Sequence, residues 1–105
     1  MMKQLTNLNS KYERLQKDLE YSIECFNKGN DKLGLNALLY FIENLENILN
    51  TFCYLNEFMP NIDKLLKALQ TLLICIKNKD IIGMVDTLEL VIYPLTEEWC
   101  KEELE

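Results

Sequence analysis

Apolar residues recur every three or four positions along most of the chain, which is the period of an α-helix and not that of a strand. Before the first helix, Ser10 followed by Glu13 has the spacing of a capping box. Gly29 supplies a stop signal. These features predict a first helix over residues 10–28, whose apolar stripe consists of Tyr12, Leu15, Leu19, Ile23 and Phe26.

A second helix is predicted over residues 31–58, with Asn30 or Asp31 as its N-cap. It ends before Pro60, because the residue that precedes a proline avoids the α region. Its apolar stripe consists of Leu35, Leu38, Leu39, Ile42, Leu45, Leu49 and Phe52.

Two further helices are predicted over residues 61–77 and 80–101, with Asp80 as the N-cap of the last. Pro94 interrupts the last one, because its ring nitrogen cannot donate to the carbonyl of Leu90. That helix therefore either kinks or restarts with Tyr93 as its boundary. The stripes are Ile62, Leu65, Leu66, Leu69, Leu72, Leu73 and Ile76 on the third helix, and Ile81, Ile82, Val85, Leu88, Ile92, Leu95 and Trp99 on the fourth.

Short loops between four helices favour antiparallel neighbours, so we expect a single all-α domain over residues 1–105, an up-down-up-down antiparallel four-helix bundle. The two halves also resemble each other. The first helix aligns with the third at an offset of 50 residues, and the second with the fourth at 49, which pairs Gly34 with Gly83. The bundle is therefore a candidate for two pseudo-repeated helical hairpins. For the two glycines we expect close approach of a neighbouring helix or loop.

The net charge and the composition limit the classes of partner and activity that we expect. The formal net charge of −6 disfavours nucleic acid and anionic membrane surfaces as partners. The chain has no histidine, the commonest general base and metal ligand, so we expect no enzyme activity. The apolar runs are too short to span a bilayer, and the first residues carry no secretory signal, so a cytoplasmic protein is expected.

The remaining candidate chemistry is sparse. The four cysteines fall one per predicted helix, at opposite poles of a bundle, so we expect reduced thiols and neither a metal site nor a cofactor. Glu46 and Glu89 fall at the edges of their stripes, where a buried carboxylate would have a raised pKa. A basic third helix, with four lysines against two aspartates over residues 61–80, is expected to pair with the acidic last helix.

Exposed aromatic and aliphatic residues outside the stripes are candidate interface residues. We expect a protein partner or a second copy to bind there, with a homodimer as one form. These residues are Tyr21, Tyr40, Tyr54, Ile74 and Tyr93. An alternative is a small-molecule cavity beneath Pro94, lined by Glu89, Tyr93 and Trp99.

The segments NKGNDKLGLNALLYFIENLENIL and IKNKDIIGMVDTLELVIYPLTEEW resemble small helical proteins of unknown function from low-GC Gram-positive bacteria. That resemblance implies no activity and no functional residues. The size, charge and predicted architecture are also similar to those of small acidic flagellar export chaperones, which hold a partner's helix in a groove. The leading hypothesis is a non-enzymatic protein-interaction or self-associating module.

Overall fold

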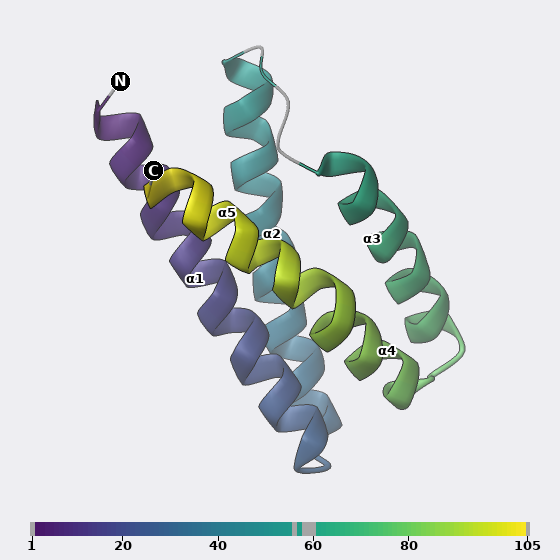
Figure 1. Ribbon diagram of the computed structural model, residues 1–105. Helices are drawn as coiled ribbons and strands as arrows, with labels where there is room; N and C mark the ends of the chain where they lie inside the picture. Colours follow the sequence, from purple (N-terminus) through teal and green to yellow (C-terminus); the bar gives the residue numbers. More distant parts are fainter. Residues whose placement is uncertain (1, 56, 58–60, 105) are drawn as a thin grey trace.

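The computed structural model, shown in Figure 1, is all-helical in its described part, as expected. We describe the backbone of residues 2–55, 57 and 61–104, and the side chains of residues 10–55, 57 and 61–100. The helices are α1 (Met2–Asn27), α2 (Asp31–Tyr54), α3 (Ile62–Lys77), α4 (Ile81–Thr87) and α5 (Tyr93–Leu104), with the π-helical turn η1 (Leu88–Ile92) between α4 and α5.

Several helix ends differ from those expected. The end of α1 is Asn27 and not residue 28, and the last helix ends at Leu104 and not at residue 101. Helix α1 begins at Met2, so Ser10 lies inside the helix; the capping-box spacing also occurs within helices and was not a start signal here. Helix α2 ends at Tyr54, earlier than the expected end at 58, and residues 56 and 58–60 lie outside the described residues. Helix α3 begins at Ile62, one residue later than expected.

The turn between α1 and α2 is a Schellman motif. The N–H of Asn30 donates to the carbonyl of Cys25 at 2.8 Å, and that of Gly29 donates to Phe26 at 3.0 Å. Gly29 has φ of 79°, the left-handed conformation that this motif requires and that glycine adopts without steric cost. The side chain of Asn30, the N-cap of α2, makes no capping hydrogen bond.

The turn between α3 and α4 repeats this backbone pattern. Asp80 N–H donates to the Cys75 carbonyl at 2.8 Å, and Lys79 N–H donates to Ile76 at 3.1 Å. Lys79 takes the left-handed position, with φ of 56°. Asp80 is the N-cap of α4, as expected, and accepts from Gly83 N–H at 2.9 Å. The two turns match at an offset of 50 residues, not the 49 expected for the following helices. The two turns share this geometry, and the repeated-hairpin interpretation stays a prediction.

The chain remains helical past Pro94. In the π turn η1, the N–H of Tyr93 donates to the carbonyl of Leu88, five residues earlier. Pro94 follows as the second residue of α5, where its missing N–H leaves the carbonyl of Leu90 without the usual partner. A π turn is wider than an α turn, which gives the proline ring room in place of a break. Thus α5 begins at Tyr93, as the restart alternative expects, but without an interruption of the helix.

The helices pack around one apolar core. Its largest member is Trp99 on α5, whose ring stacks on Tyr12 of α1 with centroids 5.7 Å apart. Stacked aromatic pairs of this kind stabilise a core beyond the area that they bury. The other fully buried large side chains include Leu15, Leu19, Leu38, Phe41, Leu45, Ile48, Leu65, Leu72, Met84, Leu88 and Ile92.

A glycine lies where α1 and α2 pack closely against each other. Gly34 lies against the ring of Phe26, and a Cβ at position 34 would stand 2.8 Å from two atoms of that ring. The buried Ser22 donates to the carbonyl of Gly34 at 2.8 Å. This confirms the expected close approach for Gly34. Gly83 is likewise crowded, by Cys75 and Asp80.

The expected apolar stripes are wider than the buried surface. Leu39, Leu66, Leu73 and Ile82 were all predicted to be core residues, yet their exposed fractions are 60%, 49%, 63% and 77%. The prediction was wrong because helical periodicity identifies an apolar face but not whether a neighbouring helix covers it.

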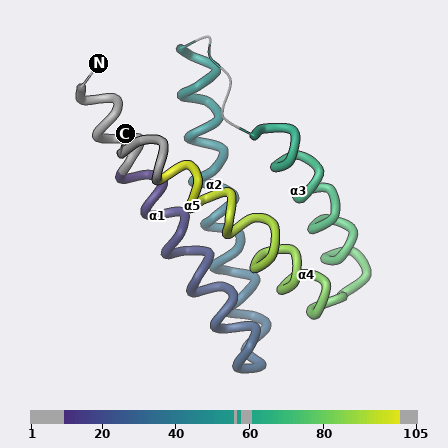
Figure 2. The backbone as a smooth tube through the Cα atoms, in the orientation of Figure 1, coloured from purple at the N-terminus to yellow at the C-terminus, as the bar shows by residue number. Residues whose placement is uncertain are grey.

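Helix α1 packs closely against α2 and α5, and α3 packs against α4. Among the described residues, α2 and α3 are not in close backbone contact. Figure 1 and the backbone tube in Figure 2 show α3 standing to one side of α2, with the run α4–α5 passing obliquely across α2 in this view. Four helical segments therefore pack together, while the up-down-up-down order stays a prediction. None of the described helices is long and apolar enough to cross a membrane.

Candidate interaction surfaces

Two apolar strips flank the space between α2 and α3, which we call the α2–α3 seam. The strip on α2 consists of Leu35, Leu39, Ile42 and Leu49, and that on α3 consists of Leu66, Leu69, Leu73 and Ile76. Residues at these spacings lie on one side of a helix. The less exposed members, Leu35, Ile42, Leu49, Leu69 and Ile76, also pack against the core.

Contacts with the other helices show on which side of its own helix each strip lies. On α2, Asn44 donates to Asp18 of α1 at 2.6 Å, so the α2 strip lies on the flank away from α1. On α3, Cys75 meets α4 at Gly83, so the α3 strip lies on the flank away from α4. The two strips therefore face the same seam.

The seam is open to solvent. Leu39 on one side is 60% exposed, and Leu73 on the other is 63% exposed. A hollow of about 370 Å³ borders the α2 strip, lined by Asn36, Leu39, Tyr40 and Glu43. Single exposed apolar residues are normal on protein surfaces, whereas apolar residues aligned along two neighbouring helices form a contiguous patch of the kind found at interaction sites.

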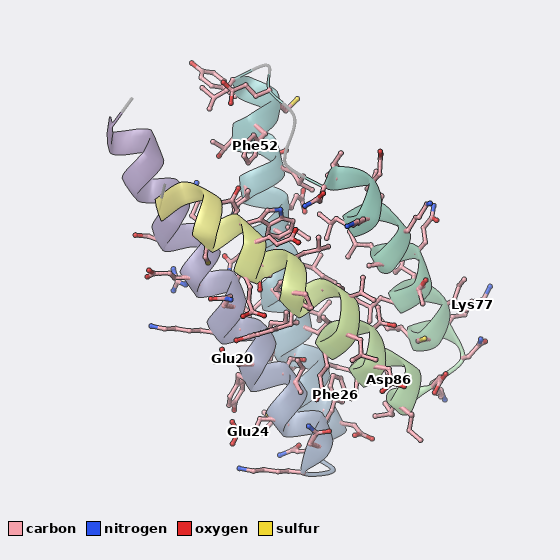
Figure 3. All side chains as sticks on the ribbon, in the orientation of Figure 1. Glu20, Glu24, Phe26, Phe52, Lys77 and Asp86 are labelled. Atoms are coloured by element: carbon pink, nitrogen blue, oxygen red, sulfur yellow. The ribbon has the colours of Figure 1, made fainter. Side chains whose placement is uncertain are left out.

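Charges of opposite sign border the two strips. At about 100° per residue, Glu43 lies at the outer edge of the α2 strip and Glu46 between its members. Lys77 lies at the outer edge of the α3 strip, whereas Lys67 lies about 100° beyond Leu66, on another face of α3. Each edge also carries one opposite charge at its helix start, Lys32 on α2 and Asp63 on α3. Figure 3 shows Lys77 extending outward from the end of α3.

Within residues 10–55, 57 and 61–100, no α3 lysine forms an ion pair with the last helix. Among the described side chains, the one ion pair joins Lys28 and Glu24 at 2.8 Å, within the α1 region. This interaction lowers the pKa of Glu24 and raises that of Lys28, chiefly through their hydrogen bond.

A second hollow, with a volume of about 410 Å³, lies between α1 and the α4–η1–α5 run. It is lined by Glu20, Ile23, Glu24, Asn27, Lys28, Glu89 and Tyr93. The hydroxyl of Tyr93 donates to Glu20 at 2.7 Å, and Asn27 donates to Glu89 at 3.4 Å. Figure 3 shows Glu20 and Glu24 on α1. Glu89 is exposed, as is Glu46, so neither carboxylate is buried.

Two residues of the expected cavity, Glu89 and Tyr93, line this hollow. The third, Trp99, is fully buried and stacks on Tyr12 in the core. Among the expected interface residues, Tyr21, Tyr40, Tyr54 and Ile74 are exposed, and Tyr93 is half-buried. Tyr40 lines the hollow that borders the α2 strip, whereas Ile74, one position after Leu73, points about 100° away from it around α3.

The cysteines are all free. Cys25 and Cys75 are buried, Cys100 is half-buried and Cys53 is exposed. Burial raises the pKa of the Cys100 thiol, and the nearby carboxylates Glu13 and Glu97 raise it further. In the described part of the chain, no group of three or more histidine, cysteine, aspartate or glutamate side chains is placed to hold a metal ion.

The Tyr93–Glu20 contact has a consequence at high pH. The hydrogen bond to Glu20 is the main cause that raises the pKa of Tyr93 to about 12, above the ordinary value of 10.0. Because the folded pKa is the higher one, this contribution to stability is fully present below pH 10.0 and is lost as pH rises toward about 12. In an ultraviolet titration, Glu20→Gln should lower the midpoint of the Tyr93 phenol. The Tyr93→Phe variant identifies that phenol by difference, and an unchanged midpoint in Glu20→Gln would contradict the assignment.

Comparison with known families decides the classification. Residues 3–102 match the family model described as Domain of unknown function (DUF8042). The chain belongs to this family. The DUF8042 match thus covers both hairpins and both strips of the seam. Neither the curated proteins nor the solved structures gave a match. The DUF8042 match names no organism, so the low-GC Gram-positive origin stays a prediction.

Proposed function

We propose that this DUF8042 chain is a non-enzymatic helical module that binds protein, either another chain or itself, through the α2–α3 seam. The observation that carries this proposal is the pair of apolar strips whose members Leu39, Leu66 and Leu73 are 60%, 49% and 63% exposed. Burying such side chains in a complex stabilises it by removing apolar area from water. The absence of histidine from the sequence supports a non-enzymatic role.

The shape of the seam suits a helical ligand. An amphipathic helix binds apolar surfaces of this kind through residues at helical spacing. An export-chaperone-like role would use the same surface for a partner's helix. A cytoplasmic location is part of this proposal.

Site-specific photo-crosslinking in cells of the native host tests the proposal. We expect a photoreactive residue at position 73 to form a covalent adduct with protein, and Leu39→Lys across the seam to suppress that adduct. A photoreactive residue at position 82 is the matched control, because Ile82 is also exposed, at 77%, but lies on α4. Equal adducts from both positions, or none from position 73, would overturn the assignment of the seam.

A second candidate function rests on the hollow between α1 and the α4–η1–α5 run. Its volume of about 410 Å³ lies within the usual size range of small-molecule sites. Ile23 supplies an apolar wall, and the carboxylates of Glu20, Glu24 and Glu89 favour a cationic ligand over an anionic one. A thermal-shift screen of organic cations would support this function if a stabilising compound lost its effect in Glu89→Gln.

A further inference from the structure

We propose that the hollow between α1 and the α4–η1–α5 run binds a linear alkyl diamine, with one ammonium group near Glu20 and the other near Glu89. This inference rests on the second candidate function and names the class of its ligand. The hollow has a volume of about 410 Å³, which is large enough for a small diamine and some bound water.

The two carboxylates lie at opposite ends of the hollow. At one end, Tyr93 donates to Glu20 at 2.7 Å, and at the other, Asn27 donates to Glu89 at 3.4 Å. Positions 20 and 27 are about two turns apart on α1, or roughly 10 Å along the helix axis. The hollow therefore presents one carboxylate at each end, and a ligand that meets both must be elongated.

The wall between the two ends is apolar. Ile23 lies one turn after Glu20 on the same side of α1, is half-buried and lines the hollow. Tyr93, also half-buried, lines it from the other helix. Methylene groups placed against this wall would be removed from water, which stabilises the bound state. An alkyl chain between two ammonium groups suits the wall, whereas a hydrated metal ion has no apolar surface to bury there.

The charges of the lining residues match a ligand with two positive charges. Glu24 and Lys28 form an ion pair with each other at 2.8 Å, so their charges cancel. Among the described side chains, neither Glu20 nor Glu89 forms an ion pair. Each accepts its hydrogen bond from a neutral group, a phenol or an amide, which leaves its negative charge in place. A ligand with a single charge would match only one of these two carboxylates.

A titration followed by nuclear magnetic resonance, with cadaverine as the probe, tests the inference on the full chain at low ionic strength. Cadaverine is a linear diamine with a five-carbon chain. We expect the methyl signals of Ile23 to shift and to saturate. Pentylamine has the same carbon chain and a single ammonium group. It should bind about three- to fivefold more weakly, which corresponds to the loss of one exposed ion pair.

Two variants test the two ends separately. In Glu20→Gln and in Glu89→Gln, cadaverine should bind about as weakly as pentylamine binds to the wild type, because each variant removes one of the two negative groups. The control Glu46→Gln removes the same charge from an exposed position on α2 and should leave the affinity for cadaverine unchanged.

Two results would overturn the diamine as ligand: equal affinity of the wild type for cadaverine and pentylamine, or equal weakening by Glu46→Gln, which would show attraction to the net charge alone. Failure of both amines to shift the Ile23 methyl signals would overturn it as well. None of these results decides the second candidate function, because a different organic cation whose stabilising effect depends on Glu89 would still support it. A cation screen without any stabilising compound would remove both.

Discussion

Replacing Trp99 with alanine should lower the free energy of unfolding by about 3–5 kcal/mol, the usual cost of emptying a large aromatic site in a core. Trp99 is fully buried and stacks on Tyr12, with an angle of 25° between the ring planes, and it joins the last helix to the first. A domain of this size has a total stability of only about 5–15 kcal/mol, so the variant should be close to unfolding under native conditions.

Urea unfolding followed by far-ultraviolet circular dichroism measures this loss, since the variant lacks the tryptophan that fluorescence would report. The control is Leu90→Ala, which removes a side chain that is 71% exposed and should change stability by less than about 0.5 kcal/mol. If Trp99→Ala and Leu90→Ala have the same stability, the account of the core is wrong.

The second large effect is expected at Gly34. Valine there should lower the free energy of unfolding by about 2 kcal/mol, because overpacking a filled site commonly costs about 1–3 kcal/mol. A Cβ at this position would stand 2.8 Å from two atoms of the buried Phe26 ring, and the Ser22 hydrogen bond holds the Gly34 carbonyl in place. In the Phe26→Leu variant, the smaller leucine leaves more room at position 34. Gly34→Val should therefore lower the free energy of unfolding by less in that variant than in the wild type.

A thermodynamic cycle of these variants measures the coupling between positions 34 and 26. Asn36→Val serves as the matched control, because it introduces the same side chain at an exposed α2 position. Strictly additive effects of Gly34→Val and Phe26→Leu would show that the glycine is not needed for the approach of α1 to α2.

The sequence identifies the helices well because their apolar spacing is regular, and it identifies Asp80 as a cap because an aspartate precedes an apolar run. The buried Ser22 was missed, although its spacing from Leu19 and Phe26 places it on the apolar stripe. Lys79 was not expected in the left-handed region, which glycine and asparagine occupy far more often.

The seam could be found only once the helices were placed. Leu39, Leu66 and Leu73 have the spacing of core residues, and their exposure depends on the distance between α2 and α3, which no local pattern encodes. The same limit applies to η1. Pro94 predicts an irregularity in the helix, but a kink, a break and a π turn can each accommodate a residue that lacks an N–H.

The central claim is that the seam is exposed in a single chain and is covered when chains associate. Leucine methyl signals recorded by nuclear magnetic resonance with a soluble paramagnetic agent test it most directly. In dilute solution, the agent should broaden the methyl signals of Leu39, Leu66, Leu73 and Leu90. Where chains associate through the seam at high concentration, the first three should be protected, while Leu90 on the π turn remains broadened. Seam methyls that are protected even at the highest dilution, or protection of Leu90 alone, would contradict the account.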